Sequence, residues 1–144
     1  MSGQRKACPV VLRETSAGRI EILAFRHPLA GTQLVKGTIE IAESVQRAAE
    51  RELLEESGLV GTAIADLGTL QMSEPEEHEW HFVMCKVKQP AESWTHWTSD
   101  GGGLDFEFFW HPLDQEPDET WHPIFKRALN FIRHSGILYP IPDL

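Results

Sequence analysis

The order of apolar and polar residues along the chain predicts several β-strands. Residues 7–14 and 19–27 are β-like runs, and the Thr-Ser-Ala-Gly segment between them predicts a hairpin in which Gly18 is available for a positive φ. A shorter apolar piece at 32–37 is expected to add a strand. Three further strand-like runs follow at 62–72, 79–88 and 104–113.

The first segment with helical spacing extends from about Ser44 to Ser57. Either Ser44 or Glu43 can cap its start, because a side-chain oxygen there accepts a backbone N–H of the first turn. Gly58 follows its last residue and can adopt the left-handed conformation that ends many helices. The sequence therefore predicts a short helix with a defined start and stop.

A second helix is predicted from about Trp121 to Ser135. Thr120 can cap it, Pro123 fits its first turn, and Gly136 ends it. Its apolar face is formed by Phe125, Leu129 and Ile132.

The segment at residues 89–103 contains proline, serine and three consecutive glycines, which favours a long, partly flexible loop over a regular element. The whole order is then strands, helix, strands, helix. This order indicates an α/β fold with a mixed sheet covered by helices, and not a repeating parallel βαβ array. Because no internal repeat or linker is visible, we expect a single domain over residues 1–144.

Composition and charge narrow the possible functions. The chain is 41% hydrophobic and 24% charged, values that are ordinary for a soluble globular protein and disfavour the disordered and membrane classes. Its 13 Lys and Arg against 22 Asp and Glu give a net charge of -9. Such a charge disfavours extended binding to a nucleic-acid backbone, so an acidic protein that handles phosphates needs a metal ion as intermediary.

Cys8 and Cys85 are too few for a disulfide framework, and both lie in apolar runs, so we interpret them as buried thiols. No apolar run reaches the length of a signal peptide or a membrane span. We therefore expect a cytoplasmic protein. The sequence leaves its oligomeric state open, with a homodimer among the options.

The first predicted helix carries an unusual concentration of glutamates. At about 100° per residue, Glu52 and Glu56 fall on the same side as Val45, Ala49 and Leu53. Glutamates normally occupy the face opposite the core, and partly buried carboxylates are costly unless they are protonated or paired with cations. A hard divalent cation such as Mg²⁺ would resolve this conflict. Taken alone, a glutamate-rich helix is more often just a solvated face.

The longer stretch GTIEIAESVQRAAERELLEESGL, residues 37–59, favours the metal site over the solvated face. It matches every defined position of the Nudix box: glycine, five residues, glutamate, seven residues, Arg-Glu, an apolar residue, any residue, Glu-Glu, any residue, glycine and an apolar residue. The matching positions are Gly37, Glu43, Arg51, Glu52, Leu53, Glu55, Glu56, Gly58 and Leu59. The chain therefore resembles the Nudix hydrolases. It carries Ala42 where relatives often have glycine.

The resemblance implies an α/β/α sandwich with a mixed β-sheet. It also implies a pyrophosphohydrolase that uses Mg²⁺ or Mn²⁺ and water to cleave the diphosphate bond of a nucleoside diphosphate linked to another group, so the expected partner is a small nucleotide or diphosphate metabolite. Metal ions suit this chemistry because they neutralise phosphate oxygens and acidify water. Two alternatives remain: a non-catalytic nucleotide-binding or regulatory module, and an enzyme that removes pyrophosphate from RNA 5′ ends.

Position-for-position matching assigns roles within the box. Glu52, Glu55 and Glu56 would be metal-site carboxylates, and Gly37 would offer its backbone carbonyl to the metal. Arg51 would orient one of the glutamates. Glu43 and Gly58 would have structural roles. Glu43 would brace the loop against the helix.

The general base and the substrate contacts are less defined by the sequence. Glu55 is a candidate base. Glu107 faces the side of its strand opposite to Phe106 and Phe108, so it is another candidate if that side is the cleft and an exposed residue if it is not. Further candidate bases are Asp105, Glu76, Glu77 and Glu79. Trp94 and Trp97 either stack on a nucleobase of the substrate or fix their loop to the core. Arg26 either contacts phosphate or is an ordinary charged strand end.

Overall fold

The computed structural model describes residues 4–73, 76–99 and 102–136. Their order of strands, helix, strands, helix agrees with the predicted order. In sequence, the elements are β1 (Gln4–Val10), β2 (Leu12–Glu14), β3 (Ile20–His27), β4 (Gly31–Gln33), β5 (Gly37–Thr38), α1 (Val45–Ser57), β6 (Thr62–Met72), β7 (His78–Lys86), β8 (Trp94–Thr98), β9 (Leu104–Pro112) and α2 (Pro123–Arg133).

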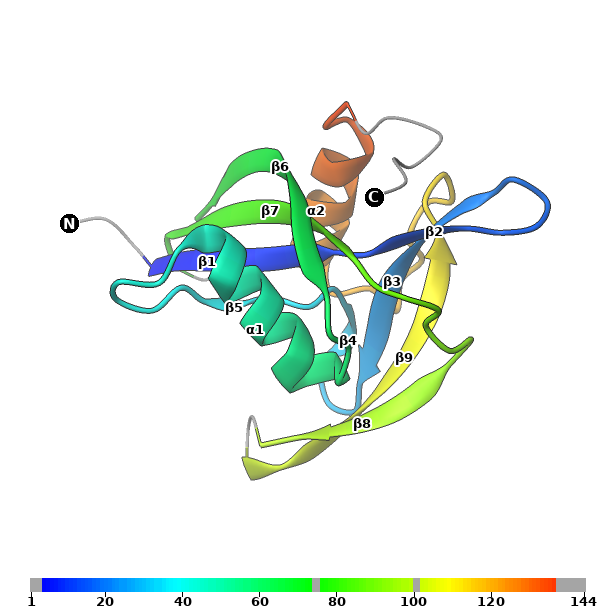
Figure 1. The fold of residues 1–144 in the computed structure, drawn as a ribbon, viewed down its shortest axis with the longest axis horizontal. Coiled ribbons are helices and arrows are strands. Elements are labelled where there is room, and N and C mark those ends of the chain that lie inside the picture. The colour runs from blue at the N-terminus through cyan, green and yellow to red at the C-terminus, as the bar shows by residue number, and fades with distance from the viewer. Residues whose placement is uncertain (1–3, 74–75, 100–101, 137–144) are drawn as a thin grey trace.

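Within the described residues, the strands form two sheets that lie next to each other (Figure 1). The first has the order β5-β1-β7-β6, and it is mixed because β1 and β7 run parallel while the other pairs are antiparallel. The second has the order β2-β3-β9-β8, with β4 paired to β3, and its strand pairs are antiparallel. The predicted mixed sheet is thus confirmed, accompanied by an antiparallel one.

One apolar run contributes to both sheets. Residues 7–14 were predicted as one strand, but the chain changes direction at Val11, so β1 joins the first sheet and β2 the second. The expected hairpin between β2 and β3 is confirmed, and Gly18 has φ 84°. The expected strand at 32–37 is also divided, because β4 pairs with β3 whereas β5 pairs with β1.

The two helices lie on opposite faces of the first sheet (Figure 1). Helix α1 packs through Ala48, Ala49 and Leu53 into a core that also contains Val83 of β7 and Phe108 of β9. Helix α2 packs into a second core, whose helix residues are Phe125, Ala128, Leu129 and Ile132. Alternate residues of β1 face these two cores, because successive side chains of a strand point to opposite faces. This arrangement buries the first sheet on both sides.

The segment 89–103 differs from the prediction, because it contains strand β8 and is not a continuous loop. Strand β8 pairs with β9 over its whole length, from Trp94 opposite Phe108 to Thr98 opposite Leu104. Tryptophan and threonine are strong β-formers, and the Trp94 ring stacks on Phe108 with 5.2 Å between centroids. These cross-strand contacts outweigh the turn-forming residues on either side.

The start of helix α2 also differs in detail. The predicted cap was Thr120, whereas His122 is the N-cap and its Nδ1 accepts the N–H of Ile124 at 3.3 Å. Thr120 instead donates its backbone N–H and hydroxyl to Asp118, which draws it into the preceding turn. Pro123 occupies the first turn as predicted. Neither helix in the described residues has the length and apolarity that spanning a membrane would require.

Candidate metal and catalytic site

The ends of helix α1 are fixed by the caps that the sequence predicts. The Ser44 side chain accepts the N–H of Arg47 at 3.1 Å, while Ser44 itself has extended backbone angles. At the other end Gly58 is left-handed, with φ 80°, and its N–H donates to the Leu54 carbonyl at 2.9 Å. These caps set which residues of the helix face the sheet.

Two of the three glutamates predicted to hold the metal are buried. Glu52 is 8% exposed and Glu56 is 5% exposed, whereas the Glu55 side chain is 56% exposed. Burial raises the pKa of Glu52, and Arg51 opposes that rise because its positive charge favours the carboxylate. The expectation that carboxylates lie on the core side of this helix is therefore confirmed for Glu52 and Glu56.

Gly37 leaves the space that the Glu52 carboxylate occupies. A Cβ added at Gly37 would collide with the Cδ and both carboxylate oxygens of Glu52. The glycine is thus required by close approach, since the Glu52 side chain lies directly against the backbone of strand β5. Because Gly37 has no Cβ, the edge of the first sheet has a small recess at this residue, and the Glu52 carboxylate of α1 fills it.

Arg51 donates hydrogen bonds to four residues around this recess. Its Nη1 donates to Glu52 Oε1 at 2.8 Å and to Glu55 Oε1 at 3.1 Å. Its Nε and Nη2 bind the two carboxylate oxygens of Glu43 at 2.7 and 2.9 Å, and Nη2 also donates to the Thr38 carbonyl at 2.9 Å. One guanidinium therefore positions two box glutamates relative to the loop and the strand that precede the helix.

The loop before the helix contains a residue in an uncommon conformation. Ala42 has φ 66°, a left-handed angle that residues with a side chain rarely adopt. The loop is closed by Glu43, whose Oε1 accepts the N–H of Glu40 at 3.0 Å. The alanine at this position of the box therefore holds the same backbone region that favours glycine.

The donor set that the sequence predicts consists of oxygen ligands, the kind that a hard divalent metal binds. It comprises the carboxylates of Glu52, Glu55 and Glu56 and the backbone oxygen of Gly37, and of these the structure brings the Glu52 carboxylate against the backbone of Gly37. In the described part of the chain no three acidic, histidine or cysteine side chains converge into a ready-made cluster. A metal ion here would therefore take part of its coordination from water and phosphate oxygens, as Mg²⁺ commonly does.

Trp94 lies at the C-terminal end of helix α1. Its indole N–H donates to the Ser57 carbonyl at 2.9 Å, and its ring stacks on Phe108. His96, two residues further along β8, donates through Nε2 to the Glu55 carbonyl at 3.2 Å. Of the two interpretations of Trp94, this geometry favours fixing its segment to the core. Trp97, by contrast, is 61% exposed.

Arg26 and Glu107 lie on the outer face of the second sheet. They are register partners on β3 and β9, and the Arg26 guanidinium lies 4.1 Å from the centre of the Phe109 ring. Glu107 is exposed, and it points away from α1 because its neighbours Phe106 and Phe108 pack into the core shared with that helix. Together with Trp94, Arg26 and Glu107 line a small pocket of about 210 Å³.

Of the two alternatives for Glu107, this placement favours an exposed residue over one that reaches the metal or the attacking water. Asp105 is also exposed and shares the outer face, so it is separated from the box glutamates in the same way. Among the other candidate bases, Glu76 and Glu77 are exposed, and Glu79 binds His81 at 2.7 Å. Among these candidates, Glu55 is the one that shares the Arg51 guanidinium with Glu52.

Sequence reasoning missed Lys6, which lies next to the recess. Its Nζ donates to the Thr38 hydroxyl at 2.7 Å, and Thr38 in turn offers its carbonyl to Arg51. Lys6 is far from the box in sequence and reaches it through the pairing of β1 with β5. No local pattern in the sequence indicates that pairing.

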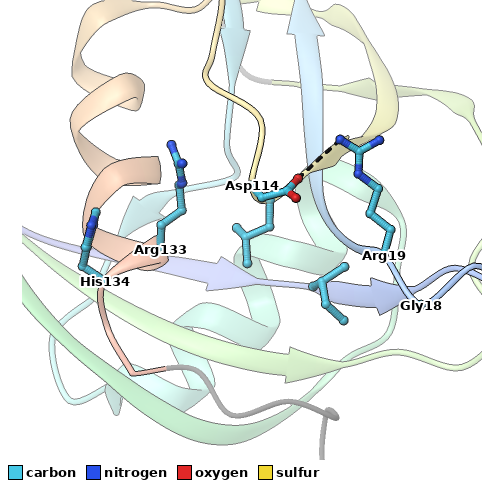
Figure 2. Close-up of a pocket in the computed structure, with 7 residues that line it drawn as sticks. Gly18, Arg19, Asp114, Arg133 and His134 are labelled. Atoms are coloured by element: carbon cyan, nitrogen blue, oxygen red, sulfur yellow. Dashed lines mark hydrogen bonds and ion pairs between the residues drawn. The ribbon is translucent and has the colours of Figure 1, made fainter.

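A larger pocket of about 440 Å³ lies away from the recess, between the β2–β3 hairpin and the end of α2. Figure 2 shows Arg19 and Arg133 on its two sides and Asp114 between them, with Arg19 bonded to Asp114 at 3.4 Å. Arg133 binds the exposed Glu116 at 2.8 Å. No residue of α1 lines this pocket, so it is separate from the buried glutamates.

Comparison with known sequences and structures identifies relatives. The NUDIX domain family model matches residues 3–130. A curated relative from Arabidopsis thaliana, "Nudix hydrolase 21, chloroplastic", is 32% identical over 91 residues, which are 60% of this chain and 46% of that protein. The chain thus spans about half the length of the curated relative that it matches.

Solved structures share the fold over almost the whole chain. A Nudix hydrolase from M. smegmatis has a TM-score of 0.70 at 16% identity, covering 100% of this chain and 92% of that one. An ADP-ribose pyrophosphatase from Streptococcus suis has a TM-score of 0.65 at 16% identity, with 96% of each chain covered. A UDP-X diphosphatase has a TM-score of 0.69 at 13% identity, covering 94% of this chain and 63% of that one. These likenesses confirm the expected α/β/α sandwich.

Proposed function

The chain belongs to the NUDIX domain family, and on that premise we propose that it is a metal-dependent pyrophosphohydrolase. Its reaction is the hydrolysis of the diphosphate bond in a nucleoside diphosphate linked to another group, by attack of water at phosphorus. The observation that carries this proposal is the burial of Glu52 against Gly37, with Glu56 buried one turn further along the same helix. Burying carboxylates is costly, and carboxylates in such positions are useful where a metal binds.

Glu52, Glu55, Glu56 and the Gly37 carbonyl would hold Mg²⁺ or Mn²⁺. When bound, such an ion neutralises phosphate oxygens and lowers the pKa of water. Arg51 holds Glu52 and Glu55 in place through its hydrogen bonds at 2.8 and 3.1 Å. Glu43 acts indirectly. It binds Arg51 and the N–H of Glu40, and so fixes the loop against the helix.

Glu55 is the residue that we assign as general base. Its side chain is 56% exposed, so water reaches it, and it lies beside the buried pair on the same helix. A base must be within hydrogen-bond reach of the proton it accepts, directly or through one water. Arg51 keeps the Glu55 carboxylate near the recess, which supplies the positioning that the reaction requires.

The net charge of the chain and the names of the similar structures support a substrate class. A net charge of -9 opposes a long nucleic-acid ligand, so a small nucleotide or diphosphate metabolite is the favoured substrate. The names of the similar structures include an ADP-ribose pyrophosphatase and a UDP-X diphosphatase. Both names describe enzymes that act on a diphosphate linked to a second group, which is the class we propose for this chain.

A substrate panel tests the proposal. Purified protein is incubated with Mg²⁺ or Mn²⁺ and with dinucleoside polyphosphates, nucleotide sugars, ADP-ribose, nucleoside triphosphates and 5′-triphosphate RNA, and products are separated by chromatography. We expect hydrolysis of at least one small substrate, and its loss in Glu55→Gln and Glu56→Gln, since both changes preserve side-chain size. Glu119→Gln, an exposed residue outside the recess, is the matched control. No turnover with either metal would favour a nucleotide-binding module.

A further inference from the structure

The pocket between the β2–β3 hairpin and the end of α2, which we call the hairpin pocket, offers several kinds of chemical group to one ligand. Its volume of about 440 Å³ lies within the range of sites that hold small organic molecules. Arg19 of the hairpin, Asp114 after β9 and Arg133 of α2 line it from three different segments (Figure 2). Ile20 and Leu113 add apolar lining. The pocket therefore combines two cations, one carboxylate and an apolar surface.

The walls of the hairpin pocket are held in place by hydrogen bonds of the backbone. The Thr15 hydroxyl oxygen accepts the N–H of Arg19 at 3.1 Å, and the N–H of Thr15 donates to the Arg19 carbonyl at 2.8 Å. Leu113 donates its N–H to the Ile20 carbonyl at 2.9 Å, which joins the segment after β9 to the hairpin. The pocket is therefore formed in the free protein, and preformed sites bind at a lower cost in free energy.

Arg133 is not needed to close its own helix. Basic residues in the last turn often bind the final carbonyls of a helix, but in α2 other groups do so. The Asn130 carbonyl accepts the N–H of His134 Nδ1 at 2.8 Å. The Ile132 carbonyl accepts the N–H of Ser135 at 3.1 Å. Arg133 instead lines the hairpin pocket, at the end of a helix that carries no acidic residue.

Each of the two arginines has an exposed carboxylate partner that a ligand can replace. Arg19 Nη2 donates to Asp114 Oδ1 at 3.4 Å, and Arg133 Nη1 donates to Glu116 Oε1 at 2.8 Å. The Asp114 and Glu116 side chains are 77% and 82% exposed, so both carboxylates can turn into solvent. Ion pairs this exposed contribute little to stability. A phosphate group can accept two hydrogen bonds from one guanidinium, so it is the stronger partner for either arginine.

We propose that the hairpin pocket binds a phosphate monoester of a small organic molecule. The phosphate lies between Arg19 and Arg133 and replaces Asp114 at Arg19, while the organic part packs on Ile20 and Leu113. A monoester carries a charge of about −1.5 to −2 at pH 7 and has three terminal oxygens, enough to accept hydrogen bonds from both guanidinium groups. The organic part uses the remaining volume and the apolar lining, which a phosphate ion alone would leave unfilled.

This inference goes beyond the proposed function, although the proposed reaction releases ligands of the same class. Attack of water at phosphorus breaks one P–O bond of the diphosphate bridge. The bridging oxygen stays on one phosphate and the oxygen of water joins the other, so the two products are both phosphate monoesters. No residue of α1 lines the hairpin pocket, so a monoester bound there does not occupy the recess. Binding in the pocket depends on the pocket residues and does not require that the chain be an enzyme.

A titration of metal-free protein tests the proposal. Isotope-labelled protein in EDTA is titrated with adenosine 5′-monophosphate, ribose 5-phosphate, inorganic phosphate and adenosine, and the backbone amide signals are followed by NMR. We expect saturable shifts at Arg19, Asp114 and His134 with at least one monoester, with inorganic phosphate binding at least about tenfold more weakly. Adenosine should leave these signals unchanged. No shift with either monoester would overturn the site, and equally tight binding of inorganic phosphate would overturn the role of the organic part.

Arginine variants test where the phosphate binds. Arg19→Gln and Arg133→Gln should each raise the Kd at least about tenfold, which corresponds to about 1.4 kcal/mol. Arg5→Gln is the matched control, because Arg5 is 50% exposed where Arg19 is 51% exposed, and it has a single contact of 3.8 Å to Glu79. Arg5 does not line the pocket, so its variant should bind normally. An equal loss in Arg5→Gln, or no loss in the two pocket variants, would overturn the proposal.

Asp114→Asn should change the affinity in the opposite direction. It removes the carboxylate that competes for Arg19, so the Kd should fall about threefold. Circular dichroism and urea unfolding midpoints show whether each variant is folded, and weaker binding by a folded Asp114→Asn would contradict the exchange. Because binding is measured without turnover, the two proposals fail separately. Binding in the pocket without hydrolysis of any substrate would refute the enzyme alone, and hydrolysis without binding in the pocket would refute this site alone.

Discussion

Arg51 and Glu43 form a two-point ion pair in which Nε meets Oε2 at 2.7 Å and Nη2 meets Oε1 at 2.9 Å. Two parallel bonds between a guanidinium and a carboxylate are stronger and more directional than a single contact. The pair joins the loop before α1 to the middle of the helix, and the Arg51 hydrogen bonds lower the pKa of Glu43 to about 2.

Glu43→Gln should therefore destabilise the protein, by roughly 1–3 kcal/mol at neutral pH. Because the folded pKa lies below the ordinary value of 4.5, the stabilisation is present above pH 4.5 and is lost as the pH falls towards 2. Urea unfolding at pH 7 and pH 3 should show a gap between wild type and variant that narrows at pH 3. Glu40→Gln is the control, since Glu40 is 68% exposed and 3.9 Å from Arg51. A gap that stays constant with pH would contradict this assignment.

Glu56→Gln should affect the metal-dependent rise in Tm differently from the Tm of the metal-free protein. Glu56 forms a side-chain hydrogen bond with Glu52 that lowers the pKa of Glu52, and a glutamine amide can keep that bond, so in EDTA the variant should melt close to the wild type, within about 2–4 °C, the shift that corresponds to 1 kcal/mol. Added Mg²⁺ or Mn²⁺ should raise the Tm of the wild type, because ligands that bind the folded state stabilise it, and should not raise that of the variant. Differential scanning fluorimetry measures both effects. A metal-dependent rise of equal size in the variant would remove Glu56 from the metal site.

Gly37→Ala should displace the Glu52 carboxylate, since the new Cβ would collide with it. We expect a loss of roughly 1–3 kcal/mol in stability together with a large loss of activity. Unfolding of the single variants and of the double variant Gly37→Ala/Glu52→Ala forms a cycle that isolates the collision. The alanine should cost much less when Glu52 is absent, and an equal cost in both backgrounds would place the strain elsewhere.

Trp94→Phe should remove the hydrogen bond to Ser57 while leaving an aromatic ring against Phe108. The expected cost is about 1 kcal/mol of unfolding free energy, with little change in KM. Trp97→Ala should stay within about 0.5 kcal/mol of the wild type, because its side chain is largely exposed. Comparing KM in the two variants tests whether either indole contacts substrate. A rise in KM confined to Trp94→Phe would support the base-stacking interpretation instead.

Ala42→Gly should stabilise the protein, because φ 66° strains any residue that has a Cβ. The gain should be about 0.5–1 kcal/mol after the added flexibility of the unfolded chain is subtracted. Chemical denaturation measures it, with Ala30→Gly as a comparison at a position without a positive φ. A destabilised Ala42→Gly would show that the loop is held in this conformation without strain.

The sequence was most informative where the structure depends on near neighbours. The boundaries of α1 follow from Ser44 and Gly58, whose side chain or backbone freedom acts within one helical turn. The position of Glu52 and Glu56 on the apolar side of the helix also follows from helical spacing, and both are buried. These features require no knowledge of which strand lies beside the helix.

Features that depend on distant partners could not be predicted in this way. Strand β8 was missed because its stability comes from pairing with β9, whereas the surrounding glycines and proline are local signals for a loop. The side of the strand on which Glu107 lies was predicted correctly, but only the packing of Phe106 and Phe108 shows which side meets α1. Lys6 joins the recess through the pairing of β1 with β5, which has no sequence signature.

Helix α1 is attached to both sheets. At its C-terminal end, Trp94 and His96 of the second sheet bind its carbonyls, while Arg51 binds the Thr38 carbonyl at the edge of the first sheet. The distance between Glu52 and Gly37 therefore depends on how the two sheets pack against each other. Partial detachment of β8 would release the end of the helix while the rest of the chain stays folded. Inactivation by heat or denaturant should then precede global unfolding, with hydrogen exchange at the end of α1 as its earliest sign.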